Sequence, residues 1–185
     1  MARIFVFAEL SGSELSPISQ EVLTKARQLG DVEAVILDPR AAGAADAAGS
    51  FGAKTVYVGA DKAYREFVAQ PAAAALAALV DEHHPDLILF GATYDARDIC
   101  ARASAKLGLT VVANATDVEV RGGGFAAVSS IFGGTQNILT ELSGPSPCVL
   151  MRPKSITAEP APGGRPKVVE VALPEGAPHG ARRTE

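Results

Sequence analysis

Apolar residues recur along residues 1–112 in two alternating patterns. Short continuous apolar runs of strand length alternate with longer segments in which apolar residues return every three or four positions. The short runs are residues 4–8, 32–37, 54–58, 86–90 and 110–112, and the helical segments are 17–29, 41–51, 61–69, 71–82 and 93–107. Strands that alternate with helices at this spacing predict a mainly parallel sheet with helices on both faces.

Local signals mark where individual helices begin and end. Ser16 followed by Pro17 predicts the start of the first helix, because serine caps helix N-termini and proline is tolerated at the first helical position. Gly30 predicts the end of that helix. The helical stretch 61–82 is expected to break before Pro71, since a residue that precedes proline is pushed out of the helical region.

The pattern changes at Ala115. We predict a C-terminal region of antiparallel strands there, built from the runs 116–121, 125–132, 137–141 and 148–152. The glycines at 122–124 predict a hairpin turn between the first two runs. Gly133 and Gly134 are expected to mark a β-bulge or the close approach of another backbone.

Residues 159–185 differ in composition from the rest of the chain. They are rich in proline and glycine and contain too few apolar residues to form a core of their own. One possible strand lies at residues 168–173. We therefore divide the chain into a domain at residues 1–158 and a linker or tail at residues 159–185.

Composition and charge exclude several classes of protein. Of 185 residues, 48% are hydrophobic and 21% are charged, with a net charge of −4, as in ordinary globular proteins. Without clustered Lys and Arg, no nucleic-acid binding is expected. No apolar stretch reaches the roughly 18–20 residues of a membrane span, and no signal or transit peptide is recognisable, so we expect a cytoplasmic protein without membrane insertion. Cys100 and Cys148 are expected to be reduced, packed thiols.

One loop is a candidate binding site. Ligands of open parallel sheets lie beyond the carboxyl ends of the strands, which directs attention to residues 9–15 and 91–98. The second loop opens a helix, and its backbone N–H groups together with Gly91, Thr93 and Arg97 form a candidate anion-binding loop. A capped helix with Arg97 paired to a neighbouring aspartate explains the same residues without a ligand. Both interpretations stay open at this point.

The residues alone indicate no catalytic or metal-binding constellation. We find no glycine-rich phosphate cradle after the first strand, no Gly-x-Ser-x-Gly nucleophile motif and no His, Cys and carboxylate cluster at metal spacing. His83 and His84 are neighbours at a helix end, where we expect solvent-facing imidazoles that complement the helix dipole. These observations favour a binding or scaffold domain over an enzyme.

Several segments, in a single colinear order, resemble the N-terminal domain of the electron transfer flavoprotein alpha subunit. The resemblance covers about residues 3 to 158. It is carried by residues 7–9, 15–26, 85–93, 97–98, 105–108, 131–134 and 151–153. The resemblance implies a Rossmann-like α/β fold of the adenine-nucleotide-binding type.

The resemblance also implies partners and cofactors. It implies an alpha/beta heterodimer that passes electrons through FAD from acyl-CoA and other dehydrogenases to a respiratory acceptor. In such proteins FAD is held mainly by a second, C-terminal alpha-subunit domain whose glycine-rich motifs do not occur in this sequence, and AMP is carried by the beta subunit. No cofactor is therefore expected on this chain alone. Ser129 and Thr135 depart from the Arg and Asn that many members have there.

Two functions from different classes follow. In the first, the chain is a scaffold domain of an electron carrier, and an apolar surface on its antiparallel region pairs with a beta subunit. The alternative is a free-standing adenine-nucleotide-binding domain of the universal-stress type, in which residues 91–97 cradle a phosphate. Replacing Arg97 distinguishes them, because only the second requires that side chain.

Overall fold

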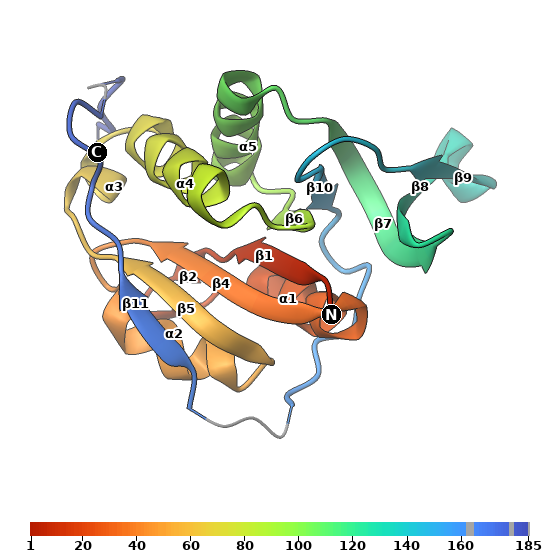
Figure 1. The fold of residues 1–185 in the computed structure, drawn as a ribbon, viewed down its shortest axis with the longest axis horizontal. Helices are drawn as coiled ribbons and strands as arrows, with labels where there is room; N and C mark the ends of the chain where they lie inside the picture. The colour runs from red at the N-terminus through yellow and green to blue at the C-terminus, as the bar shows by residue number, and fades with distance from the viewer. Residues whose placement is uncertain (162–164, 178–179, 185) are drawn as a thin grey trace.

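The computed structural model describes residues 1–161, 165–177 and 180–184. Within these ranges, nine strands form one sheet in the order β11-β5-β4-β1-β6-β10-β7-β8-β9, and helices cover both faces of its parallel part (Figure 1). This arrangement confirms the predicted α/β class. The strands of the large sheet are β1 (Arg3–Phe7), β4 (Asp31–Leu37), β5 (Ala53–Gly59), β6 (Leu87–Gly91), β7 (Val111–Arg121), β8 (Gly124–Ile131), β9 (Gln136–Glu141), β10 (Cys148–Met151) and β11 (Lys167–Glu170).

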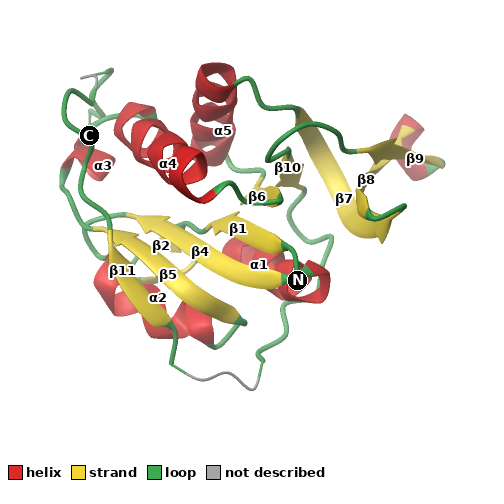
Figure 2. Ribbon diagram, viewed as in Figure 1, coloured by secondary structure: helices red, strands yellow, loops and turns green. Residues whose placement is uncertain are grey.

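Two hydrophobic clusters lie on opposite faces of the parallel strands. Helices α1 (Pro17–Leu29) and α2 (Ala41–Gly49) pack on one face (Figure 2). Helices α3 (Ala63–Glu66), α4 (Gln70–His83) and α5 (Tyr94–Leu107) pack on the other. Central strands β1 and β6 are therefore buried on both sides, which explains why their sequences are continuous apolar runs. A two-stranded hairpin of β2 (Leu10–Ser11) and β3 (Glu14–Leu15) follows β1.

The predicted helix boundaries hold at the strongest signals. The Ser16 hydroxyl accepts a hydrogen bond from the Ser19 N–H at 3.3 Å, and Pro17 opens α1. The Gly30 N–H closes that helix on the Ala26 carbonyl. The predicted break between the two helices is present, but it lies earlier than expected: α3 ends at Glu66, Ala69 has a positive φ, and Gln70, the residue before Pro71, already belongs to α4.

Residues 111–141 form an extension of the sheet that we call the arm. It consists of β7, β8, the 3₁₀ turn η1 (Phe132–Gly134) and β9, and it stands apart from the helices at the right of Figure 1. Both strand pairs of the arm are antiparallel, and the turn between β7 and β8 uses Gly122 and Gly123 at positive φ, as predicted. Gly133 and Gly134 instead form the β8–β9 turn with φ of 67° and 94°, so the expected bulge or close backbone approach is wrong.

Strand β10 corrects the prediction for the end of the domain. We expected it among the antiparallel strands, but it lies between β6 and β7 and is parallel to both. All four of its residues are buried, as in a central strand of a parallel sheet. The chain leaves the parallel sheet to form the arm and then returns to it in β10. A short apolar run predicts that a strand is buried, but it does not predict which strands it pairs with.

The region predicted to be a linker or tail contributes the last strand. β11 pairs in parallel with β5 and forms the edge of the sheet. The predicted strand at 168–173 is thus present, although it begins and ends earlier. The division of the chain at residue 158 stays a prediction.

Four side chains refine the sequence interpretation. Cys100 and Cys148 are free and buried, as expected, and a hydrogen bond between the two thiols together with burial raises the pKa of Cys148. His84 is exposed as predicted, whereas His83 is half-buried, with its ring 5.1 Å from that of Tyr57 and 6.1 Å from that of Phe5. No helix among the described residues is long and apolar enough to cross a membrane.

Candidate functional site

The arm carries most of the large apolar side chains that the described residues leave exposed. They are Val111, Val120, Phe132, Ile138 and Leu139, with 37 to 75% of each residue exposed. Outside the arm, only Met1, Tyr94 and Val168 are comparable within the described part of the chain. An apolar surface on the antiparallel region was predicted, and this prediction is confirmed.

Strand register shows how the apolar side chains of the arm are grouped. Val118 lies opposite Ala127, Val120 lies opposite Phe125, and Ala127 lies opposite Thr140. Because alternate residues of a strand share a face, these side chains and Ile138 lie on one side of the arm, which we call the inner face. Val118 and Ala127 are fully buried in the core cluster that includes α1, whereas Val120 and Ile138 are 61% and 45% exposed. The parallel strands and their helices, which we call the body, cover the inner face at Val118 and Ala127. The inner face continues this core outward to Val120 and Ile138, which the body does not cover.

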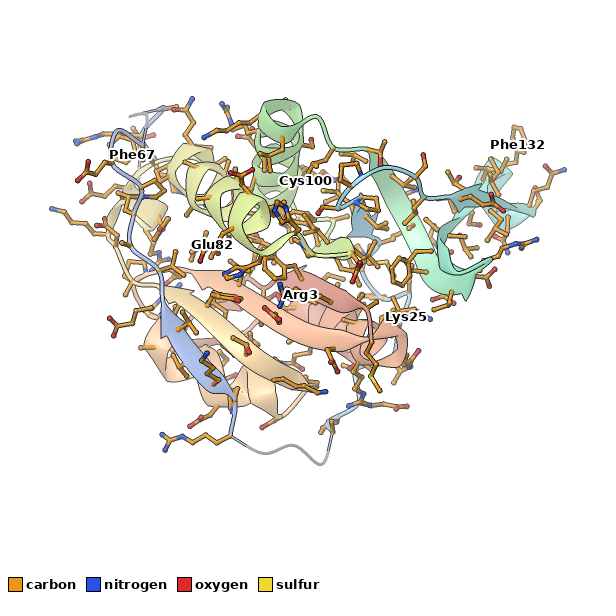
Figure 3. All side chains as sticks on the ribbon, in the orientation of Figure 1. Arg3, Lys25, Phe67, Glu82, Cys100 and Phe132 are labelled. Carbon is orange, nitrogen blue, oxygen red and sulfur yellow. The ribbon has the colours of Figure 1, made fainter. Side chains whose placement is uncertain are left out.

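Two features keep the arm in place at its root. Lys25 Nζ of α1 lies 2.6 Å from Asp117 Oδ1 of β7, and Figure 3 shows Lys25 between that helix and the arm. The Arg152 N–H, just after β10, donates to the Ala115 carbonyl at 2.7 Å. The open part of the inner face is thus held in a fixed position relative to the parallel sheet.

The outer end of the arm presents an aromatic ring in an unfavourable backbone conformation. Phe132 has φ of 49° and is 75% exposed, and Figure 3 shows it at the end of the molecule. A positive φ is uncommon for a bulky residue and costs of the order of 1–3 kcal/mol, a cost that is typical of functional positions. Thr135 Oγ1 donates to the Phe132 carbonyl at 2.9 Å and fixes this turn. Thr135, one of the two departures from the family pattern, therefore has a local structural role.

A second concave region lies at the carboxyl ends of β1 and β4. We call it the crevice; it has a volume of about 260 Å³. Its lining combines an apolar floor with charged side chains of both signs: Phe7, Ala8, Glu9, Leu10, Leu37, Asp38, Arg40, Tyr64, Arg65, Ala69, Ala72, Asp95, Ile99 and Arg183. Ligands of open α/β sheets bind at the carboxyl ends of the strands, at the point where the strand order reverses. In this sheet the order reverses at β1, because β4 and β5 follow on one side of it and β6 lies on the other.

The three residues of the predicted anion-binding loop have different surroundings in the structure and do not converge on one site. Gly91 is buried against Ile18, whose side chain a Cβ at position 91 would meet at 2.5 Å. The Thr93 hydroxyl caps α5 by accepting from the Ala96 N–H at 3.0 Å, and it donates to Glu9 at 2.8 Å. Arg97 is exposed and does not line the crevice. Phosphate binding by this loop stays a prediction, and the Glu9 carboxylate beside Thr93 already places negative charge there.

The expected partners of Arg97 are engaged elsewhere. Asp98 accepts from Arg102 at 2.7 Å, and Asp95 accepts from Arg183 at 2.6 Å. The helix start is thus capped, as the interpretation without a ligand requires, but the ion pairs differ from those expected.

Two carboxyl groups of the crevice have shifted pKa values in opposite directions. Burial raises the pKa of Glu9 above 4.5, although the hydrogen bond from Thr93 opposes this. Burial also acts to raise the pKa of Asp38, but hydrogen bonds from Arg40 outweigh it and lower the pKa below its ordinary value. Arg40 binds both oxygens of Asp38 at 2.8 Å, which explains why that carboxyl group stays ionised.

Sequence reasoning missed most of the residues that line the crevice. A usable signal was present, because Glu9 and Asp38 each follow a buried strand directly. Tyr64 and Arg65 lie in a four-residue helix, and Arg183 lies near the end of the chain. No local pattern brings these distant segments to the same edge of the sheet.

The described residues do not fit a metal ion or an entire FAD molecule. They contain no group of three or more potential metal-ligating side chains. The crevice has a volume of about 260 Å³, which is less than the roughly 300–1,000 Å³ of pockets that hold drug-sized ligands. It is therefore too small to enclose a molecule as large as FAD. We therefore derive no flavin chemistry from the residues of this chain.

Comparison with known proteins gives a consistent result. A family model described as "Electron transfer flavoprotein domain" matches residues 4–175. The chain is 32% identical over 183 residues to the electron transfer flavoprotein subunit alpha of Mycobacterium tuberculosis, and 31% identical over 177 residues to that of Mycobacterium leprae. It is also 30% identical over 164 residues to the protein FixB of Clostridium saccharobutylicum.

These alignments cover most of this chain but only part of each relative. They include 98%, 94% and 85% of the chain and 56%, 55% and 47% of the respective relatives. The chain thus spans about half the length of the curated relatives it matches. Because the family model matches nearly the whole chain and the relatives agree with it, the chain belongs to the electron transfer flavoprotein domain family.

Proposed function

We propose that this chain is the N-terminal domain of an electron transfer flavoprotein alpha subunit and serves as a scaffold for assembly with a beta subunit. The observation that carries the proposal is the inner face of the arm. It is apolar, it continues the core of the domain, and its outer part at Val120 and Ile138 is exposed. An exposed apolar face of this kind typically marks a protein interface.

The electron carrier itself would be the assembled protein. FAD bound in that assembly would supply the redox chemistry for electron transfer from acyl-CoA and other dehydrogenases to a respiratory acceptor. The residues of this chain contribute rigid support for the complex. AMP, in this proposal, belongs to the beta subunit. The relatives named alpha subunit support this assignment.

The proposal is tested by measuring the affinity of this chain for the electron transfer flavoprotein beta subunit of the same organism. The variant Ile138→Asp places a charge on the open part of the inner face. Burying an unpaired charge at an interface is costly, so we expect affinity to fall by about tenfold or more.

A matched control is Tyr94→Ser. Tyr94 is 93% exposed, lies at the start of α5 and is not part of the arm. This variant removes an exposed large side chain from another surface and should leave the affinity unchanged. Equal loss of affinity in both variants, or none in Ile138→Asp, would contradict the proposed role of the arm.

A further inference from the structure

The crevice has features of a ligand site that the assembly role of the arm does not explain. It lies beside α3 and the first turns of α4 and α5, at the carboxyl ends of β1 and β4. The arm is a separate region, because it extends the sheet on the far side of β10. Its floor includes the side chains of Phe7, Leu37 and Ile99. A flat apolar group of modest size would therefore find a complementary surface there.

Guanidinium groups reach the crevice from three separate segments. Arg40 follows β4, Arg65 lies in α3, and Arg183 lies near the end of the chain. Arg40 and Arg183 are bound to Asp38 and Asp95 at hydrogen-bonding distance. Arg65 is held less closely: its Nε lies 3.8 Å from Asp38 Oδ2, and its side chain is 57% exposed. Arg65 is thus well placed to turn toward an anion in the crevice.

Tyr64 provides a second, independent observation. Tyr64 lines the crevice and is only 6% exposed, yet its hydroxyl has no hydrogen-bond partner among the described residues. Burial, together with the charge of Asp61, raises the pKa of Tyr64 to about 12, so the hydroxyl stays a donor at neutral pH. A buried polar group without a partner costs about 1–3 kcal/mol and is uncommon in folded proteins. An acceptor-rich ligand would relieve this cost.

The segment that carries Arg183 is docked beside the crevice. The Arg183 N–H donates to the Glu66 carbonyl at 2.9 Å, and the Val68 N–H donates to the Ala181 carbonyl at 2.8 Å. The Arg182 guanidinium lies 5.1 Å from the centre of the Phe67 ring. These contacts hold Arg183 at the rim, where it faces Asp95 of α5.

We propose that the crevice binds a small phosphate monoester with a flat apolar body. The flat group would lie on the floor at Phe7, and the phosphate would take hydrogen bonds from Arg65, Arg183 and the Tyr64 hydroxyl. Phosphate fits this donor set because it offers several acceptor oxygens and is bound strongly by guanidinium groups. The carboxylates of Glu9, Asp38 and Asp95 also line the crevice and oppose an anion, and the titration below measures whether the guanidinium groups outweigh them. A cavity of about 260 Å³ limits the ligand to about the size of an aryl phosphate.

The test uses calorimetric titration of the full chain with phenyl phosphate. Inorganic phosphate and benzoate, measured in parallel, separate the contributions of the phosphate and the ring, and AMP distinguishes a nucleotide from a smaller aryl ester. We expect phenyl phosphate to bind at least tenfold more tightly than inorganic phosphate, benzoate and AMP. No measurable binding of phenyl phosphate, or equal binding of all four probes, would overturn the proposal.

Variants connect the binding to the residues. Arg65→Ala should weaken binding of the ester by about tenfold, since a charge-assisted hydrogen bond is lost. Tyr64→Phe removes only the hydroxyl; it should weaken binding while leaving the melting temperature unchanged or raised. Arg121→Ala is the matched control, because Arg121 of β7 is exposed and outside the crevice. Loss of binding in Arg121→Ala, or none in Arg65→Ala and Tyr64→Phe, contradicts the assignment.

Discussion

The parallel body and the arm are parts of one sheet, but different forces stabilise them. In the body, Ile4, Phe5 and Val6 of β1 are fully buried between helices on both faces. In the arm, β9 is exposed at nearly every position and β7 is buried only at Ala115 and Val118. Burial of apolar surface therefore stabilises the body, whereas backbone pairing and a narrow apolar root stabilise the arm.

This difference has a functional meaning. A few strands with one apolar face have limited stability in water unless that face is covered. The body covers the arm only at its root, through α1, and leaves Val120 and Ile138 exposed. The central strands of the body are thus covered on both faces, and the arm is the part whose apolar surface a partner would complete.

The largest expected effect is a loss of unfolding free energy when a buried side chain of the body is truncated. Phe90 is fully buried, and its ring lies 5.7 Å from that of Phe7. Phe90→Ala removes a large buried side chain and should lower the free energy of unfolding by about 3–5 kcal/mol. The counterpart in the arm, Ile138→Ala, should change it by at most about 0.5 kcal/mol, because the site is solvent-facing. Urea unfolding of both variants measures the contrast, and similar losses would show that the arm is as tightly packed as the body.

An intermediate effect separates stability from binding within the arm. Asn tolerates a positive φ better than Phe, so Phe132→Asn should relieve strain at the β8–β9 turn and raise the free energy of unfolding by about 0.5–1 kcal/mol. The same variant removes an exposed aromatic side chain and should lower affinity for the beta subunit by roughly tenfold. Thermal unfolding and binding measurements on the same sample check both parts. If stability and affinity fall together, Phe132 is structural.

The smallest effect concerns pH and the crevice. The pKa of Glu9 is raised in the folded state, so the folded chain binds more protons than the unfolded chain just above pH 4.5. The contribution of Glu9 to stability must then decrease as pH rises through this range. Glu9→Gln cannot titrate, and its unfolding free energy should fall less between pH 4.5 and pH 7 than that of the unaltered chain. Parallel pH series of urea unfolding test this; identical slopes would show that Glu9 has no raised pKa.

Local sequence signals predicted several elements of the fold well. Ser16, Pro17 and Gly30 defined α1 because capping and proline geometry depend on neighbouring residues only. The hairpin at Gly122 and Gly123 followed from glycine's tolerance of positive φ. The position of β10 between β6 and β7 did not follow, since pairing between strands distant in the sequence leaves no local pattern.

The two candidate sites differ in how far the sequence revealed them. The apolar surface was predicted as a consequence of the assembly role that the family resemblance implies, and the alternating residues predicted the antiparallel strands that carry it. For the crevice, the sequence directed attention to the loops 9–15 and 91–98, which supply Glu9, Leu10 and Asp95 to its lining, but the candidate residues Gly91, Thr93 and Arg97 do not line it. Arg97 lies outside it, whereas Tyr64, Arg65 and Arg183 reach it through tertiary folding alone.

The most direct test of the account is hydrogen–deuterium exchange of the chain with and without the beta subunit. The strands β7 to β9 should exchange faster than β1 and β6 in the free chain, since exposed backbone opens more readily. On addition of the beta subunit, we predict slower exchange in the arm and no change in the central strands. Protection confined to the surface of α4 and α5, with the arm unchanged, would contradict the claim that the arm is the assembly surface.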